Sequence, residues 1–349
     1  MKTNNFSSIK RDSVRQIFKY ISDNLSVSRA EIATATDLSI MTVGKVVDAF
    51  LELDILSQSK EVKSVAGRKA GLVTLNTNNY SVVFDLTSKK FTMVLIDIAL
   101  NQVDKIVYEY SDNFYFEENV YIFLKNSKIY LSSKFDSAKC IGYGFCVPGC
   151  YDAKIDKIVS KSIPELGNIS ISSIFNEIFN SSPLYVDSEV YSGAVSVMNS
   201  MHDLKDKCFT YVYFGNNRIV GTSVKNEVYI SGDLKLPVSF GSTLAQDSRS
   251  LDSIISNSTS SEELIFPLAS FISGLISTLL PDAIVLENDN DGFGEQSKQR
   301  LSETVAKILS VPLSSLPELR FSKSAIKHSH LGVAVKIRER WIDNIITNE

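Results

Sequence analysis

Apolar residues near the start of the chain recur every three or four positions, which predicts a series of helices. The first spans residues 11–25. A second begins at Ser28, because Ser28 and Glu31 form a capping box in which each side chain satisfies a backbone N–H group at the helix start. After a break at Asp37, a third helix begins with Ser39 as its N-cap. The apolar face of this third helix consists of Val43, Val46, Val47, Phe50 and Leu51.

The residues after the third helix predict a two-stranded wing with a basic tip. Apolar residues 55–56 and 72–75 flank a polar stretch that contains Gly67-Arg68-Lys69. Two short helices joined by a tight turn, with a solvent-facing start to the second, form the helix-turn-helix layout that enters the DNA major groove. We therefore predict a winged helix-turn-helix domain over residues 1–78. The alternative is an ordinary helical hairpin followed by a basic loop.

This layout indicates which side chains contact double-stranded DNA. The predicted contacts are Ser39, Met41, Thr42, Lys45, Arg68 and Lys69. Thr42 and Lys45 lie one turn apart near the start of the third helix, the part that reaches base edges. Ser39 can donate a hydrogen bond to a phosphate. Arg68 and Lys69 suit the minor groove or phosphates, although the same two residues are also compatible with a solvated basic loop.

From residue 80 the apolar pattern becomes typical of strands. Runs at 80–86, 91–98 and 103–110 predict an antiparallel meander, followed by alternating helices and strands. A second meander within 209–230 is followed by a similar alternation that ends in a helix over 331–346. The Ser-rich stretch 248–261 predicts a loop or a poorly ordered excursion. The repeated order predicts two related α/β lobes with a cleft between them: 79–190, completed by 325–349, and 191–324.

Charge is distributed unevenly along the chain. Residues 1–76 carry 11 Lys and Arg against 8 Asp and Glu, whereas the rest carries 25 against 32. A mildly basic N-terminal segment ahead of an acidic body fits a DNA-binding head on a domain that does not itself contact DNA.

Composition and apolar runs limit the class of protein. We expect no apolar run to reach the roughly 20 residues of a membrane-spanning helix, and the polar residues 1–5 do not resemble a signal peptide. We therefore expect a cytoplasmic protein that does not contact a membrane. In that compartment Cys140, Cys146, Cys150 and Cys208 are expected to be reduced. Cys146 and Cys150 have ligand-like spacing, but no nearby His or Cys completes a metal site.

A winged helix-turn-helix ahead of two such lobes resembles the ROK family (repressors, open reading frames and kinases), over nearly the whole chain. The best-matching segments are Ser28-Arg29-Ala30-Glu31-Ile32-Ala33, Thr42-Val43, Gly67-Arg68-Lys69, Leu75-Asn76, Val83-Phe84-Asp85 and Gly142-Tyr143-Gly144-Phe145-Cys146-Val147-Pro148-Gly149. The resemblance implies an actin-like, ribonuclease-H-like sugar-kinase fold after the head. It also implies a regulator that senses a sugar and releases or engages an operator as a dimer or tetramer.

The chain departs from the family at its phosphate-binding segments. The family's Asp-x-Gly-Gly-Thr loop corresponds to Asp85-Leu86-Thr87-Ser88-Lys89, which lacks both glycines that let the backbone approach phosphate. The second glycine-rich loop corresponds to residues 215–221 and keeps only its outer glycines. Glu287-Asn288 replaces the Gly-Gly pair near the adenosine, which would put a carboxylate in the nucleotide's path. These three losses argue against ATP binding, so we assign no catalytic residue and no cofactor.

The sugar site is altered as well. The family's Asn-Asp-x-Asn motif, whose Asp is the general base, aligns with Ser188-Glu189-Val190-Tyr191, and a shifted alignment puts Asp187 at the Asp position. Asp187, Ser188, Glu189 and Tyr191 are therefore the candidate ligand-binding residues. The alternative is that Glu189 only stabilises the first turn of a helix through the helix dipole.

The family's Gly-Glu-x-Gly-His motif aligns with residues 238–242, where both functional side chains are missing. The three zinc-binding cysteines that follow in the family are absent too, so we expect no metal. His202, His328 and His330 lie outside these motifs and are expected to be surface or packing residues.

The sequence thus predicts a DNA-binding transcriptional regulator of carbohydrate-related genes, with repression favoured. Its inactive kinase-like body would sense a sugar or sugar phosphate and form a homodimer or homotetramer. One alternative is an ATP-dependent sugar kinase that carries a DNA-binding head. The other is a regulator whose body only oligomerises.

Overall fold

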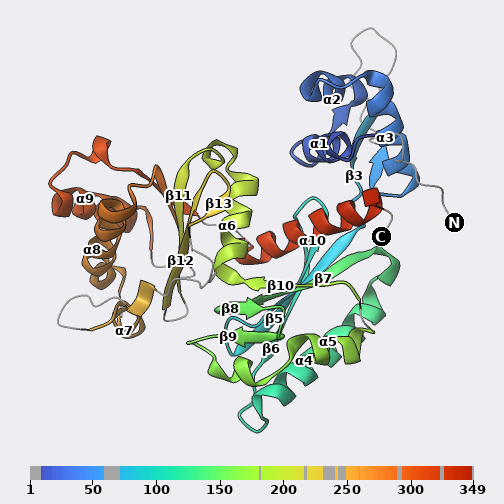
Figure 1. The fold of residues 1–349 in the computed structure, drawn as a ribbon. Coiled ribbons are helices and arrows are strands. Elements are labelled where there is room, and N and C mark those ends of the chain that lie inside the picture. The colour runs from blue at the N-terminus through green and yellow to red at the C-terminus, as the bar shows by residue number, and fades with distance from the viewer. Residues whose placement is uncertain are drawn as a thin grey trace.

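The computed structural model describes residues 9–58, 71–180, 182–215, 218–230, 240–242, 249–258, 260–288, 293–322 and 326–347. The N-terminal head contains three helices and a small antiparallel sheet of order β1-β3-β2 (Figure 1). Its elements are α1 (Arg11–Ser22), β1 (Val27–Ser28), α2 (Arg29–Thr36), α3 (Ile40–Glu52), β2 (Leu56–Gln58) and β3 (Leu72–Leu75).

Local hydrogen bonds explain where the head helices begin. The Ser28 N–H donates to Glu31 Oε2 at 2.7 Å and the Glu31 N–H donates to Ser28 Oγ at 3.2 Å, which is the predicted capping box. Asp37 ends α2 in the left-handed region, with φ 55°. Ser39 caps α3 as predicted. The predicted first helix is three residues too long, since α1 ends at Ser22 and Leu25 is 95% exposed.

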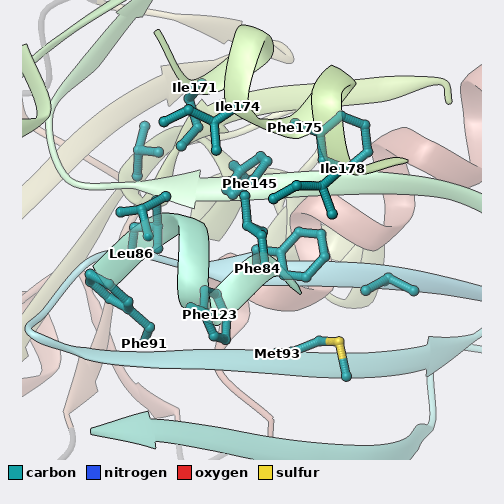
Figure 2. Packing of buried hydrophobic residues seen from close by; sticks show 14 of the residues in the cluster. Phe84, Leu86, Phe91, Met93, Phe123, Phe145, Ile171, Ile174, Phe175 and Ile178 are labelled. Atoms are coloured by element: carbon teal, nitrogen blue, oxygen red, sulfur yellow. The ribbon is translucent and has the colours of Figure 1, made fainter. Parts of the chain in front are cut away.

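The first body sheet has the order β10-β7-β4-β5-β6. Helices α4 and α5 pack on one face, where aromatic and aliphatic side chains from β4, β7 and both helices interlock (Figure 2). Helix α10 packs against β4 and β7 through a second cluster of buried residues. The elements are β4 (Tyr80–Asp85), β5 (Lys90–Asp97), β6 (Gln102–Glu109), α4 (Phe116–Lys134), β7 (Cys140–Val147), β8 (Cys150–Asp152), β9 (Lys157–Val159), α5 (Ile171–Phe179) and β10 (Leu184–Ser188).

The second body sheet repeats this connectivity with the order β13-β12-β11-β14-β15. In each sheet the first strand pairs antiparallel with the next strand in the chain and parallel with a later one. The predicted duplication of an α/β lobe is therefore confirmed. The elements are α6 (Glu189–Ser200), β11 (Cys208–Gly215), β12 (Arg218–Lys225), β13 (Val228–Tyr229), α7 (Leu251–Asn257), α8 (Ser261–Leu279), β14 (Ala283–Asn288), α9 (Glu295–Leu309), β15 (Glu318–Ser322) and α10 (His328–Thr347).

Two expectations about the second lobe were wrong. The Ser-rich stretch contains α7 rather than only a loop, because Ser250 caps it and Leu251, Ile254 and Ile255 are buried at helical spacing. The expectation that no apolar run reaches membrane-spanning length was also wrong, because residues 262–279 of α8 are long and apolar enough to cross a membrane by length and composition. Six of its apolar residues lie in the core of the second lobe, namely Leu264, Leu268, Ala269, Ile272, Leu275 and Ile276.

Helices α6 and α10 cross so closely that their backbones touch. A Cβ atom on Gly332 of α10 would lie 1.7 Å from the carbonyl oxygen of Ser192 on α6. The same crossing is bridged by a 2.7 Å hydrogen bond between Ser196 Oγ and His328 Nδ1. From there α10 runs to the head (Figure 1), where Ile342 and Ile346 join its hydrophobic core. One helix therefore connects the centre of the body to the head.

We predict that Gly332→Ala lowers the free energy of unfolding by about 3 kcal/mol or more, because no flexible side chain can move aside for the added methyl group. The matched control is Gly274→Ala in α8, where an added Cβ meets nothing within 4 Å. That change should stabilise the protein by up to about 1 kcal/mol through helix propensity. Urea unfolding measures both, and equal stabilities for the two variants would contradict the close crossing.

Candidate functional site

The first turn of α3 presents most of the predicted DNA contacts to solvent. Met41 is 71% exposed, and Ser39 and Lys45 are exposed as well. Thr42 is half-buried, since its N–H donates to Ser39 Oγ at 3.1 Å and the two hydroxyls lie 2.9 Å apart. The structure thus brings four of the six candidates together at the N-terminal end of α3. Arg68 and Lys69 lie outside the described residues.

An ion pair links α2 and α3 beside this surface. Arg29 Nη2 lies 2.5 Å from Asp48 Oδ1, and both side chains are partly exposed. An exposed pair of this kind contributes little to stability. Its effect is geometric, because it joins the two helices whose relative angle sets how α3 projects from the head.

Buried charged and polar side chains gather where the two body sheets meet the start of α10. We call this the central polar cluster, and it comprises Asp85, Glu189, Arg218, Glu287, His328 and His330. All six are less than 9% exposed. They come from β4, α6, β12, β14 and α10, so only the tertiary fold assembles them.

Asp85 is the surviving carboxylate of the degenerate phosphate loop. His330 Nε2 lies 2.7 Å from Asp85 Oδ2, Lys327 Nζ lies 3.6 Å from the same oxygen, and the Thr87 N–H donates to Asp85 Oδ1 at 2.7 Å. Burial alone would raise the pKa of Asp85, but the hydrogen bond and charge of His330, together with Lys327, hold it well below its ordinary value. The carboxylate is therefore ionised and held by the chain's own basic groups.

Glu189, the candidate counterpart of the family's general base, is held in the same way. Its Oε2 lies 2.6 Å from Arg218 Nη2, and both side chains are only 8% exposed. Arg218 Nη1 also donates to Ser162 Oγ at 3.1 Å. Arg218 follows directly after Asn216 and Asn217, which lie outside the described residues. A guanidinium from the second phosphate loop thus lies against the candidate sugar-binding carboxylate.

The other three candidate ligand residues make structural contacts nearby. Ser188 caps α6 by accepting the Val190 N–H at 3.3 Å. Asp187 Oδ2 accepts the Tyr185 hydroxyl at 2.5 Å. The ring of Tyr191 is buried and packs edge-on against Tyr229, with ring centroids 4.8 Å apart. The four residues lie at the end of β10 and the start of α6, but Glu189 alone belongs to the central polar cluster.

Two expectations about this region were wrong. His328 and His330 are not ordinary surface or packing residues, because both lie in the central polar cluster, whereas the His202 side chain is 53% exposed. Glu287 points into the protein rather than towards a nucleotide. It accepts the Tyr211 hydroxyl at 2.5 Å and the His328 N–H at 2.9 Å, so it caps the first residue of α10.

His328 completes this network in its neutral form. Its Nδ1 pairs with Ser196 Oγ at 2.7 Å and its Nε2 with Ser322 Oγ at 2.5 Å. Burial lowers the pKa of His328, although Glu287 opposes the shift. A sequence signal did exist, since helical periodicity extended back from residue 331 would have placed both histidines on the first turn of α10.

The described parts of the chain contain no candidate metal site, because nowhere in them do three or more His, Cys, Asp or Glu side chains surround a common point. The four described cysteines are free thiols. Cys146 is fully buried, and burial raises the pKa of its thiol. Of the segment aligned with the Gly-Glu-x-Gly-His motif, only Phe240, Gly241 and Ser242 are described.

We predict that Asp85 contributes to acid sensitivity. Because its pKa is lower in the folded state than the ordinary value of about 3.9, its contribution is complete above about pH 5 and is lost as the pH falls toward the folded-state pKa. Asp85→Asn should flatten the fall in unfolding free energy between about pH 5 and 2. Asp112→Asn, an exposed control, should leave the slope unchanged, and a full slope in Asp85→Asn would refute the assignment.

Comparison with known proteins gives partial sequence matches and a match over the whole fold. No family model matches the chain. The chain is 25% identical over 193 residues to a xylose repressor of Bacillus spizizenii, covering 53% of this chain and 48% of the repressor. It spans about half the length of the curated relatives it matches.

Solved structures share the fold at low sequence identity. A ROK family transcriptional regulator, a homolog of the E. coli MLC protein, matches with a TM-score of 0.69 and 12% identity over 97% of this chain and 98% of that one. A ROK family glucokinase from Streptomyces griseus, in complex with glucose and AMPPNP, matches with a TM-score of 0.59 and 11% identity over 75% of this chain and 100% of that one. These matches show that the chain has the fold of ROK family proteins and that its sequence is similar to xylose repressors.

Proposed function

We propose that the chain is a DNA-binding transcriptional regulator that represses carbohydrate-related genes. The observation that carries this proposal is the exposed first turn of α3 on a capped pair of helices, which is the geometry that reads a major groove. The likeness to xylose repressors supports both the repressor role and the sugar link, and it makes xylose the first effector to test.

We propose that the body is not an enzyme. A sugar kinase needs a carboxylate available to the sugar hydroxyl and a backbone loop that cradles the phosphates of ATP. In this chain Glu189 is paired with Arg218, and Asp85 is paired with His330. Both carboxylates are thus engaged by the chain's own basic side chains. The first phosphate loop lacks both glycines, and the second keeps only its outer ones.

The proposal assigns roles to three segments. Residues 1–78 bind an operator through Ser39, Met41, Thr42, Lys45, Arg68 and Lys69. Residues 79–190, completed by 325–349, and residues 191–324 form the two lobes of a body that senses a sugar or sugar phosphate near Asp187, Ser188, Glu189 and Tyr191. The protein acts in the cytoplasm as a homodimer or homotetramer.

Two other functions remain as test outcomes. The first is a sugar kinase that carries a DNA-binding head, because 75% of this chain matches the fold of the glucokinase described above. A regulator whose body only oligomerises would bind no carbohydrate. A thermal-shift panel that includes xylose separates the last case, because a sensing body should be stabilised by at least one sugar or sugar phosphate.

We predict that Lys45→Ala and Arg68→Ala weaken binding to a duplex selected from a random DNA pool by the wild-type chain. A lost base contact should reduce the affinity by roughly 5- to 150-fold, corresponding to about 1–3 kcal/mol. Gel-shift titration at one fixed salt concentration measures this effect. Lys125→Ala, an exposed change on α4 of the body, is the control, and affinities equal to the control would remove these residues from the interface.

We predict that no hexose or pentose is phosphorylated at the expense of ATP. The coupled release of ADP over a sugar panel that includes glucose and xylose provides the measurement, with an active hexokinase as the positive control. Any sugar-dependent turnover that scales with the concentration of this protein would establish the kinase alternative instead.

A further inference from the structure

A cavity of about 300 Å³ lies between the head and the C-terminal helix. It is lined by residues of α1, α6 and α10, and its volume is at the lower end of those that hold small ligands. Phe18 and Ile342 supply apolar wall, whereas Asn199 and Ser22 supply polar groups. No residue of the central polar cluster lines the cavity, so it is separate from the candidate sugar site.

Two of the cationic side chains that line the cavity have no carboxylate partner within the described residues. The lining includes Arg15, Lys19, Arg338, Glu339 and Asp343. Asp343 Oδ1 lies 2.7 Å from Arg15 Nε, and Glu339 Oε2 lies 2.8 Å from Lys336 on the same helix. Within the described ranges, Lys19 and Arg338 therefore have no ion-pair partner.

Arg338 is the buried member of this pair of cations, with only 5% of its surface exposed. Its Nη1 donates to the carbonyl of Ile98 at 2.8 Å, and its Nη2 lies 3.5 Å from Asn199 Oδ1. Its Nε is buried and has no hydrogen-bond partner in the described part of the chain. This guanidinium therefore has fewer acceptors than donors, and a charged donor of this kind binds oxyanions strongly.

Lys19 lies on the head side of the cavity and has a second ammonium as its neighbour. Partial burial and the nearby Lys205 both lower the pKa of Lys19, whereas Asp23 and Glu227 oppose the shift. Lys205 itself lies 3.6 Å from Glu227. Two like charges at one position favour an anion that is shared between them.

We propose that this cavity binds a small phosphate-bearing ligand of about monosaccharide size, with its phosphate on Arg338 and Lys19. Asn199 and Ser22 are the groups that can bind its hydroxyls. An occupant would contact α1 of the head and α10 of the body together. Binding here and binding of DNA would then be linked reciprocally, a consequence that rests on the proposed function, whereas the binding itself does not.

Isothermal titration of the full chain with inorganic phosphate, ribose 5-phosphate and ribose tests the site. The two phosphate compounds should bind and neutral ribose should not. Lys19→Gln should weaken the binding of both phosphate compounds at least tenfold. Arg11→Gln, an equal loss of charge on the same helix but outside the cavity, should bind as the wild type does.

Absence of binding by both phosphate compounds would overturn the proposal. Equal binding by ribose would also overturn it, because the site would then not select for charge. A Lys19→Gln chain that binds as tightly as the wild type would locate the anion elsewhere in the molecule and have the same consequence. The titration contains no DNA, so its result is independent of whether the head binds an operator.

Discussion

The direct contact between the backbones of α6 and α10 is the constraint on which the rest of the body depends. Gly332 leaves no space between α10 and the carbonyl of Ser192. Helix α10 covers one face of the first sheet, and α6 packs against β11 and β12 of the second. The two duplicated lobes therefore meet at this helix pair, and the register of the pair determines which polar groups meet at its end.

The central polar cluster follows from this arrangement. Because α10 begins where β4 and β14 end, His330 reaches Asp85 and the N–H of His328 reaches Glu287. A buried carboxylate without a partner is costly, so each of these charges needs a donor supplied by the fold. One of these carboxylates, Asp85, aligns with the first phosphate loop of the ROK kinases.

The C-terminal end of α10 packs against the head and positions it relative to the body. Arg338 contacts the carbonyl of Ile98 and approaches Asn199, and its guanidinium lies 5.9 Å from the ring centre of Phe18. Ile342 continues into the hydrophobic core of the head. The head therefore shares part of its core with the body. A change in the position of α10 between the lobes would move α3 through packed side chains rather than through a flexible linker.

Features that depend on neighbouring residues could be predicted from the sequence alone. The capping box at Ser28 and the N-cap at Ser39 involve groups three residues apart, and the strand meanders show their period directly. The helix in the Ser-rich stretch was missed because composition was weighed above the buried spacing of Leu251 and Ile254.

Only tertiary structure decided the partners of Asp85, Glu189 and Glu287, because His330 lies 245 residues from Asp85 and no local pattern relates them. The sequence by itself determined the elements and their order, since hydrogen bonds within a turn or between adjacent strands are local. The chemistry of the interior was decided by long-range packing, which alone brings the charged groups together.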